Sequence, residues 1–220
     1  MKYLFLILFI VFSVLHLIAS FNDDAEKRKK TKPFLLIWLL LYYVFSTDNL
    51  SVFLVLALFF SWLGDVLLIP KGHKWFAFGG ISFMFSHLFF ILAYTNNFEF
   101  KDLKPVVLVI AGIVYFGTSF KIMRELRVST PKSMIFPMFF YLMCNSTMNM
   151  FALMQMMSRK DLGSVVAYIG AVLFFISDCT LFLVRYYKNK DIIYKKHFTV
   201  MLTYLLGEFL ITLGILIMRG

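Results

Sequence analysis

The sequence predicts an all-α, polytopic membrane protein: a bundle of about eight transmembrane helices forming a single integral membrane domain over residues 1–220. Three observations predict this class. Hydrophobic residues make up 61% of the chain, and the mean hydropathy is +0.83. Charged residues make up 15%, against about 25% in a typical soluble domain. Apolar segments also recur along the whole chain, many near the ~20 residues that a spanning helix needs.

Eight apolar segments follow one another, and most are long enough to span: residues 2–21, 33–47, 50–69, 75–95, 104–121, 133–157, 161–185 and 195–218. The first resembles a signal peptide in length, but Lys2 gives a weak basic region and no small-x-small cleavage site precedes FNDDAEKRKK, so we expect a helix. The second is short and is counted because the pattern continues. No loop exceeds about a dozen residues, so any function must be built from helices and their ends.

Basic residues concentrate in alternate loops. Loops one, three, five and seven hold 16 of the 22 Lys and Arg: Lys27, Arg28, Lys29, Lys30, Lys32, Lys71, Lys74, Lys121, Arg124, Arg127, Lys132, Arg185, Lys188, Lys190, Lys195 and Lys196. The other six are Lys2, Lys101, Lys104, Arg159, Lys160 and Arg219. The positive-inside rule makes these odd-numbered loops cytosolic and both termini non-cytosolic. Topology, with some attraction to anionic lipid, therefore explains the net charge of +10 without nucleic acid as a partner.

Polar side chains inside the apolar segments are the candidates for function, because a charge at the bilayer centre costs about 2.5–3.5 kcal/mol on insertion scales. Asp65 lies about one turn, and Asp178 about two turns, from the predicted cytosolic ends of their segments. His87, Asn145 and Glu208 lie near the middle. The full set is His16, Asp65, His87, Asn145, Asn149, Asp178, Tyr204 and Glu208. This one-sided distribution predicts a cavity that opens toward the cytosolic leaflet.

Several of these residues have a purely structural alternative. His16 is a lone histidine that fits a structural or interfacial role, and His87 can be a satisfied core histidine. Asn145 and Asn149, four residues apart on one helix face, either line a site or join helices by hydrogen bonds. Asp65 could instead pair at the interface with Lys71 or Lys74. Cys144 and Cys179 fit small core residues, and three histidines at one depth are lacking, so no metal or other cofactor is expected.

Two sequence patterns bear on packing. The segment 133–157 contains eight of the 13 Met, which suits either a surface for a variable acyl chain or packing against irregular neighbours. Gly163, Ala167 and Ala171 have small-xxx-small spacing, which predicts close contact with another helix. LFFSWLGD and AVLFFISD end on the two aspartates. This similarity is either a weak parallel four-plus-four repeat or a coincidence in a chain with 28 Phe.

Four stretches, SWLGDVLL, GGISFMFSHLFFILAY, GAVLFFISDCTLFLVRY and MLTYLLGEFLI, together with Lys32–Pro33, resemble the YhhN-like lysoplasmalogenase family over residues 32–212. The resemblance implies a multi-pass membrane enzyme that hydrolyses the vinyl ether bond of lysoplasmalogens to a fatty aldehyde and a glycerophospho-base. It makes Asp65 and Asp178 the principal catalytic candidates, with His87 and Tyr204 at further motif positions. The family usually has Ala-Gln where this chain has Gly207–Glu208, which makes the substrate less certain than the fold.

The chemistry of a vinyl ether suits two carboxyl groups. Its β-carbon must be protonated by an acid, and a base must activate the water that attacks the resulting oxocarbenium ion. Two carboxyls in different environments can supply both functions, and we predict that Asp65 and Asp178 do so, in either order. The expected substrate-binding residues are His87, Asn145, Asn149, Tyr204, Glu208 and Lys32. Lys32, Lys71 and Lys74 lie at the rim, where a lysine could hold the substrate's phosphate.

Two other functions fit the same residues. Asp65, His87, Asp178 and Glu208 could form the relay of a proton-coupled transporter or channel. Helices broken at mid-membrane would favour transport, but Gly79–Gly80 and Pro137 lie nearer the ends of their segments, which favours an enzyme. A lipid-binding protein without turnover is the third alternative. The expected partners are a lyso-lipid substrate and the bilayer, and the sequence does not determine the oligomeric state.

Overall fold

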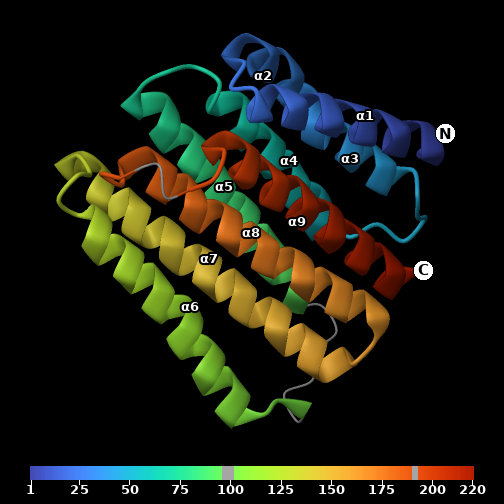
Figure 1. Ribbon diagram of the computed structural model, residues 1–220. Helices are drawn as coiled ribbons and strands as arrows, with labels where there is room; N and C mark the ends of the chain where they lie inside the picture. Colours follow the sequence, from blue (N-terminus) through green and yellow to red (C-terminus); the bar gives the residue numbers. More distant parts are fainter. Residues whose placement is uncertain (96–101, 190–192) are drawn as a thin grey trace.

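All eight apolar segments contain helices in the computed structural model, which describes residues 1–95, 102–189 and 193–220 and has no strand in these ranges (Figure 1). The helices are α1 (Lys2–Phe21), α2 (Ala25–Thr31), the 3-10 turn η1 (Lys32–Phe34), α3 (Leu35–Val44), α4 (Val52–Leu67), α5 (His73–Thr95), α6 (Pro105–Leu126), α7 (Lys132–Arg159), α8 (Leu162–Tyr186) and α9 (Lys196–Arg219). The predicted all-α membrane bundle is confirmed.

The helices differ in their ability to cross a bilayer. Five are long and apolar enough to span: α1, α5, α6, α8 and α9. Helix α4 has 16 residues, and α7 has 28 but carries many buried polar side chains. The second apolar segment, predicted over 33–47, forms an α-helix of only ten residues because Pro33 occupies the preceding 3-10 turn. At 1.5 Å per residue, α3 covers about half of the ~30 Å hydrocarbon core.

Seven helices form a closed ring in the described part of the chain. In order around the ring, each packing on the next, they are α1, α3, α4, α5, α7, α8 and α9, and α9 returns to α1. Helix α6 lies outside the ring against α7 and α8, at the edge of the molecule in Figure 1. The ring brings segments from both ends of the sequence around one centre.

The closest helix pair is α8 with α9. A Cβ atom added to Gly163 would lie 2.7 Å from the carbonyl oxygen of Gly214, and one added to Gly214 would lie 2.5 Å from the backbone nitrogen of Ala167. The backbones therefore touch where larger side chains would hold them apart. The predicted close packing of the Gly163, Ala167 and Ala171 face is confirmed at Gly163 and Ala167.

The two termini lie at one end of the bundle, and α2 lies at the opposite end (Figure 1). Helix α2 is charged and is capped by Asp24, which accepts a hydrogen bond from the Lys27 amide. Of the lysines used to predict the orientation, Lys101 and Lys190 lie outside the described residues. The five apolar spans make the chain a multi-pass membrane protein; the cytosolic side of the odd-numbered loops stays a prediction, as does the four-plus-four repeat.

Candidate active site

Asp65 lies in the last turn of α4, where its side chain points into the ring and is 2% exposed. Its Oδ1 is 3.2 Å from the Lys32 ammonium, and its Oδ2 accepts a hydrogen bond of 2.9 Å from the Tyr204 hydroxyl on α9. Asp65 thus pairs with Lys32, whereas Lys71 and Lys74 are exposed. Both oxygens of a buried carboxyl are satisfied, as burial of a charged pair requires.

Two side chains hold Lys32 beside Asp65. The indole of Trp62, one turn before Asp65 on α4, donates to the carbonyl oxygen of Pro33 at 2.9 Å. His16, buried on α1, is 2.7 Å from the hydroxyl of Thr31. These bonds fix the backbone on either side of Lys32. His16 therefore has a structural role, which is one of the two roles that the sequence analysis expected for it.

Asp178 on α8 is held through one oxygen. Its Oδ2 accepts hydrogen bonds from the Tyr141 hydroxyl at 2.7 Å and from the Asn145 amide at 2.8 Å, both on α7. The Nε2 atom of His87 on α5 lies 3.2 Å from the same Oδ2. Its Oδ1 has no hydrogen-bond partner among the described residues, so one oxygen of this carboxyl is left for another molecule.

The hydrogen-bond partners of His87 fix the position of its first hydrogen. Nδ1 contacts the carbonyl oxygen of Phe83 at 2.5 Å, and because a carbonyl only accepts, Nδ1 carries a hydrogen. Nε2 faces Asp178 Oδ2 at 3.2 Å, close enough for an ion pair but without hydrogen-bond geometry. Nε2 is therefore the ring nitrogen through which His87 can exchange a proton with Asp178.

Both aspartates line one cavity of about 90 Å³, together with Lys32, Ser177, His197 and Tyr204. Lys32 and His197 stand near the end of the bundle that carries α2, and Asp178 lies about two helical turns before the end of α8. This volume is large enough for about three water molecules, since one occupies about 30 Å³ of liquid. Two carboxyl groups, a lysine and a histidine thus converge on one small space among apolar helices.

A protein-family model, the YhhN family, matches residues 28–215 of the chain. The chain belongs to the YhhN family. The matched range contains both aspartates and all their hydrogen-bond and ion-pair partners, from Lys32 to Tyr204. No curated relative and no solved structure matches the chain.

The other expected site residues lie around this YhhN cavity without lining it. His87 and Asn145 reach it through Asp178, and Asn149 donates from its amide to the side chain of Asn145 at 3.1 Å. The three therefore form a second layer behind Asp178. No group of three or more His, Cys, Asp or Glu that could hold a metal occurs within residues 1–95, 102–189 and 193–220.

Glu208 is fully buried one turn beyond Tyr204 on α9. Among the described residues, neither of its carboxyl oxygens has a partner with hydrogen-bond geometry. Ser61 is adjacent to it, but the Ser61 hydroxyl is bonded to Ser86 at 2.7 Å. Glu208 is thus near both aspartates but separate from their hydrogen-bond networks.

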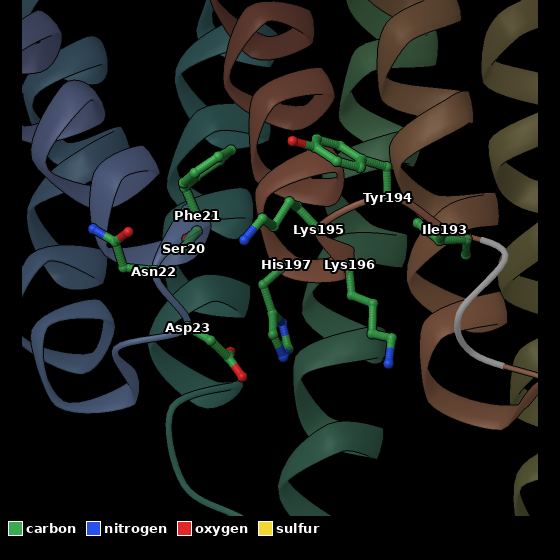
Figure 2. Close-up of a pocket in the computed structure, with 9 residues that line it drawn as sticks. All are labelled: Ser20, Phe21, Asn22, Asp23, Ile193, Tyr194, Lys195, Lys196 and His197. Atoms are coloured by element: carbon green, nitrogen blue, oxygen red, sulfur yellow. The ribbon is translucent and has the colours of Figure 1, made fainter.

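Two site residues escaped the sequence analysis of this YhhN chain. Tyr141 is one of 11 Tyr, but it precedes Asn145 and Asn149 at four-residue intervals on one face of α7, and this spacing identifies it. His197 lines the cavity from the first turn of α9. It also lines a larger hollow of about 670 Å³ at the end of the bundle. Figure 2 shows this hollow, with Asp23 on one side and Lys195 and Lys196 on the other.

Proposed function

We propose that this YhhN family member is a membrane hydrolase that cleaves the vinyl ether bond of lysoplasmalogen-type lipids to a fatty aldehyde and a glycerophospho-base. The observation that carries the proposal is the shared cavity of Asp65 and Asp178, with one carboxyl beside a lysine and the other beside a histidine. Vinyl ether hydrolysis requires one acid and one base within reach of the same bond. Family membership supports the same reaction class.

The His87–Asp178 pair is the proposed acid. In this proposal the pair carries one proton, and the Oδ1 atom of Asp178, which has no hydrogen-bond partner among the described residues, delivers it to the vinyl ether. Transfer of the proton to the β-carbon of the double bond converts the ether carbon into an oxocarbenium ion. The Tyr141 and Asn145 hydrogen bonds then stabilise the Asp178 carboxylate that remains, and this carboxylate lies beside the positive charge that develops.

Asp65 is the proposed base. The Lys32 ammonium and the Tyr204 hydroxyl both stabilise its carboxylate form, because each donates to one of its oxygens. The carboxylate takes a proton from the attacking water, whose oxygen bonds to the oxocarbenium carbon. The hemiacetal then breaks its C–O bond to the glycerol oxygen: Asp65 gives this oxygen the proton it took from water, and the hemiacetal hydroxyl loses its own proton to the Asp178 carboxylate as the aldehyde C=O forms. One water is consumed, aldehyde and alcohol are released, and both carboxyl groups return to their starting states.

The test is release of fatty aldehyde from a vinyl ether lyso-lipid by the protein purified in detergent. Asp65→Asn and Asp178→Asn should each lower the rate by at least a hundredfold while the protein remains folded. Asp161→Asn, at the start of α8, is the matched control because Asp161 caps the helix far from the cavity. Activity that survives both substitutions refutes the mechanism. Proton flux into liposomes without aldehyde release would instead favour a relay, although α5 and α7 run unbroken past His87 and Asn145.

A further inference from the structure

An apolar groove lies between α5 and α7, on the outer side of the ring. Its volume is about 330 Å³, and its lining is hydrocarbon and thioether except for one tyrosine hydroxyl. Gly80 and Met84 line it from α5, and Met134 and Met138 line it from α7. Phe136, on the rim, is 70% exposed toward the surface that the bilayer covers. A groove of this composition is suited to a hydrocarbon chain.

The side chain of Tyr141 connects this groove with the candidate active site. Tyr141 lines the groove, and its hydroxyl donates to Asp178 Oδ2 at 2.7 Å. Phe182 also lines the groove, and its ring packs on that of Tyr141 with a centroid distance of 5.3 Å. The inner end of the groove is therefore adjacent to the carboxyl group of Asp178.

The size of the catalytic cavity requires such a neighbouring space. At about 90 Å³, the cavity is well below the ~300–1,000 Å³ of a typical small-molecule site. It accommodates the reacting bond and a few waters but not a long chain. We therefore propose, resting on the proposed function, that the groove between α5 and α7 binds the hydrocarbon chain of the single-chain lipid substrate and sets which chain lengths are accepted.

The glycine at position 80 keeps the groove open, because any larger residue there would place a side chain in it. A Cβ atom on Gly80 would meet nothing within 4 Å, whereas one on the adjacent Gly79 would come within 2.7 Å of Leu68. Close packing therefore explains Gly79 but not Gly80. The absent side chain at Gly80 leaves space in the groove, and the flexible methionines around it adapt to chains of different shape.

The test compares Gly80→Leu, which fills the groove, with Gly112→Leu. Gly112 is the matched control because it lies on α6, where an added Cβ also meets nothing within 4 Å. With vinyl ether lyso-lipids of increasing chain length, Gly80→Leu should lower kcat/KM for the longest chains about tenfold relative to the shortest, as expected from losing the burial of roughly two methylene groups. Gly112→Leu should keep the wild-type profile. Equal profiles in the two variants overturn the proposal.

A binding measurement separates this inference from the proposed reaction. A lyso-phospholipid with a saturated chain and a photoreactive group near the chain end should label residues 132–141 of the wild type and of Gly112→Leu, and label Gly80→Leu several-fold less. The labelling needs no catalysis, so it tests the groove even if no aldehyde is released. Excess two-chain phospholipid should not prevent the labelling. Full competition by two-chain lipid, or equal labelling of Gly80→Leu, would mean that the groove holds only bulk bilayer lipid and would overturn the inference.

Discussion

The hydrogen bond from Tyr141 to Asp178 allows the sharpest test of the site. Tyr141→Phe removes one oxygen atom and leaves the ring, which packs against His87 and Phe182. The bond is 2.7 Å long and buried. A hydrogen bond to a charged group contributes about 1.5–3 kcal/mol, so its loss from the Asp178 carboxylate formed in the reaction predicts a decrease in kcat of about 10- to 150-fold.

The matched control is Tyr115→Phe. Tyr115 has the same exposed fraction as Tyr141, 6%, and its hydroxyl makes a hydrogen bond of similar length, 2.8 Å, but with Tyr168, between α6 and α8. This substitution should lower stability by about 0.5–1.5 kcal/mol, the usual contribution of a neutral hydrogen bond, and leave the rate of aldehyde release unchanged.

The assay is the initial rate of aldehyde release, measured over a range of substrate concentrations so that kcat and KM are obtained separately, with thermal unfolding in the same detergent. Because the donor acts on the carboxylate left after proton transfer, kcat should fall more than KM rises. The reasoning is refuted if kcat of Tyr141→Phe stays within twofold of wild type, or if Tyr115→Phe lowers kcat to the same extent.

Three further predictions concern stability. Gly214→Ala should lower the free energy of unfolding by about 1–3 kcal/mol because the new methyl group collides with α8, whereas Gly112→Ala, with open space at its Cβ, should not lower it. Glu208→Gln should keep or raise the melting temperature, because it replaces a buried carboxyl that lacks a partner among the described residues by a neutral group of similar shape. Asp161→Ala should lower stability by about 0.5–2 kcal/mol, since Asp161 accepts from the Ser164 amide at 2.7 Å as the N-cap of α8.

The Asp161 effect should depend on pH. Partial burial alone would raise the pKa of Asp161. The Ser164 amide and the nearby Arg159 guanidinium outweigh this effect and hold the pKa below its usual value of 3.8. The cap therefore stabilises the fold fully above that value and loses its contribution as the pH falls below it. Chemical denaturation at neutral and strongly acidic pH measures this. A difference in stability between wild type and Asp161→Ala that grows on acidification contradicts the assignment of Asp161 as a charged cap. Separately, a Gly214→Ala protein as stable as wild type contradicts the predicted collision between α9 and α8.

The sequence predicted the existence of the helices better than their contacts. Long apolar runs identify segments such as α8 and α9 because lipid selects for composition over about 20 residues. Depth along the segments also predicted that Asp65 and Asp178 face one region, and they line one cavity. The second segment was predicted to be short, but it was not predicted that Pro33 lies in a separate 3-10 turn and leaves an α-helix of ten residues.

The partners of the aspartates were harder to predict. Lys32 belongs to a loop rich in lysine, and only the fold of η1, held by Trp62, selects it for Asp65. Tyr141 is one of 11 Tyr in a chain with 28 Phe, and only its four-residue spacing from Asn145 and Asn149 distinguishes it from the others. Hydropathy describes how a helix meets lipid, whereas these pairs depend on how helices meet one another.

The order of the residues around each aspartate affects how the protein is made. Lys32 precedes Asp65 in the chain, and His87, Tyr141 and Asn145 all precede Asp178. During synthesis, α4 and α8, which carry the two aspartates, thus leave the ribosome after at least one side chain that can bond to the aspartate's carboxyl group. The insertion machinery need not release either aspartate into lipid without a partner, and Tyr204, which arrives with the last helix, completes the set of partners of Asp65.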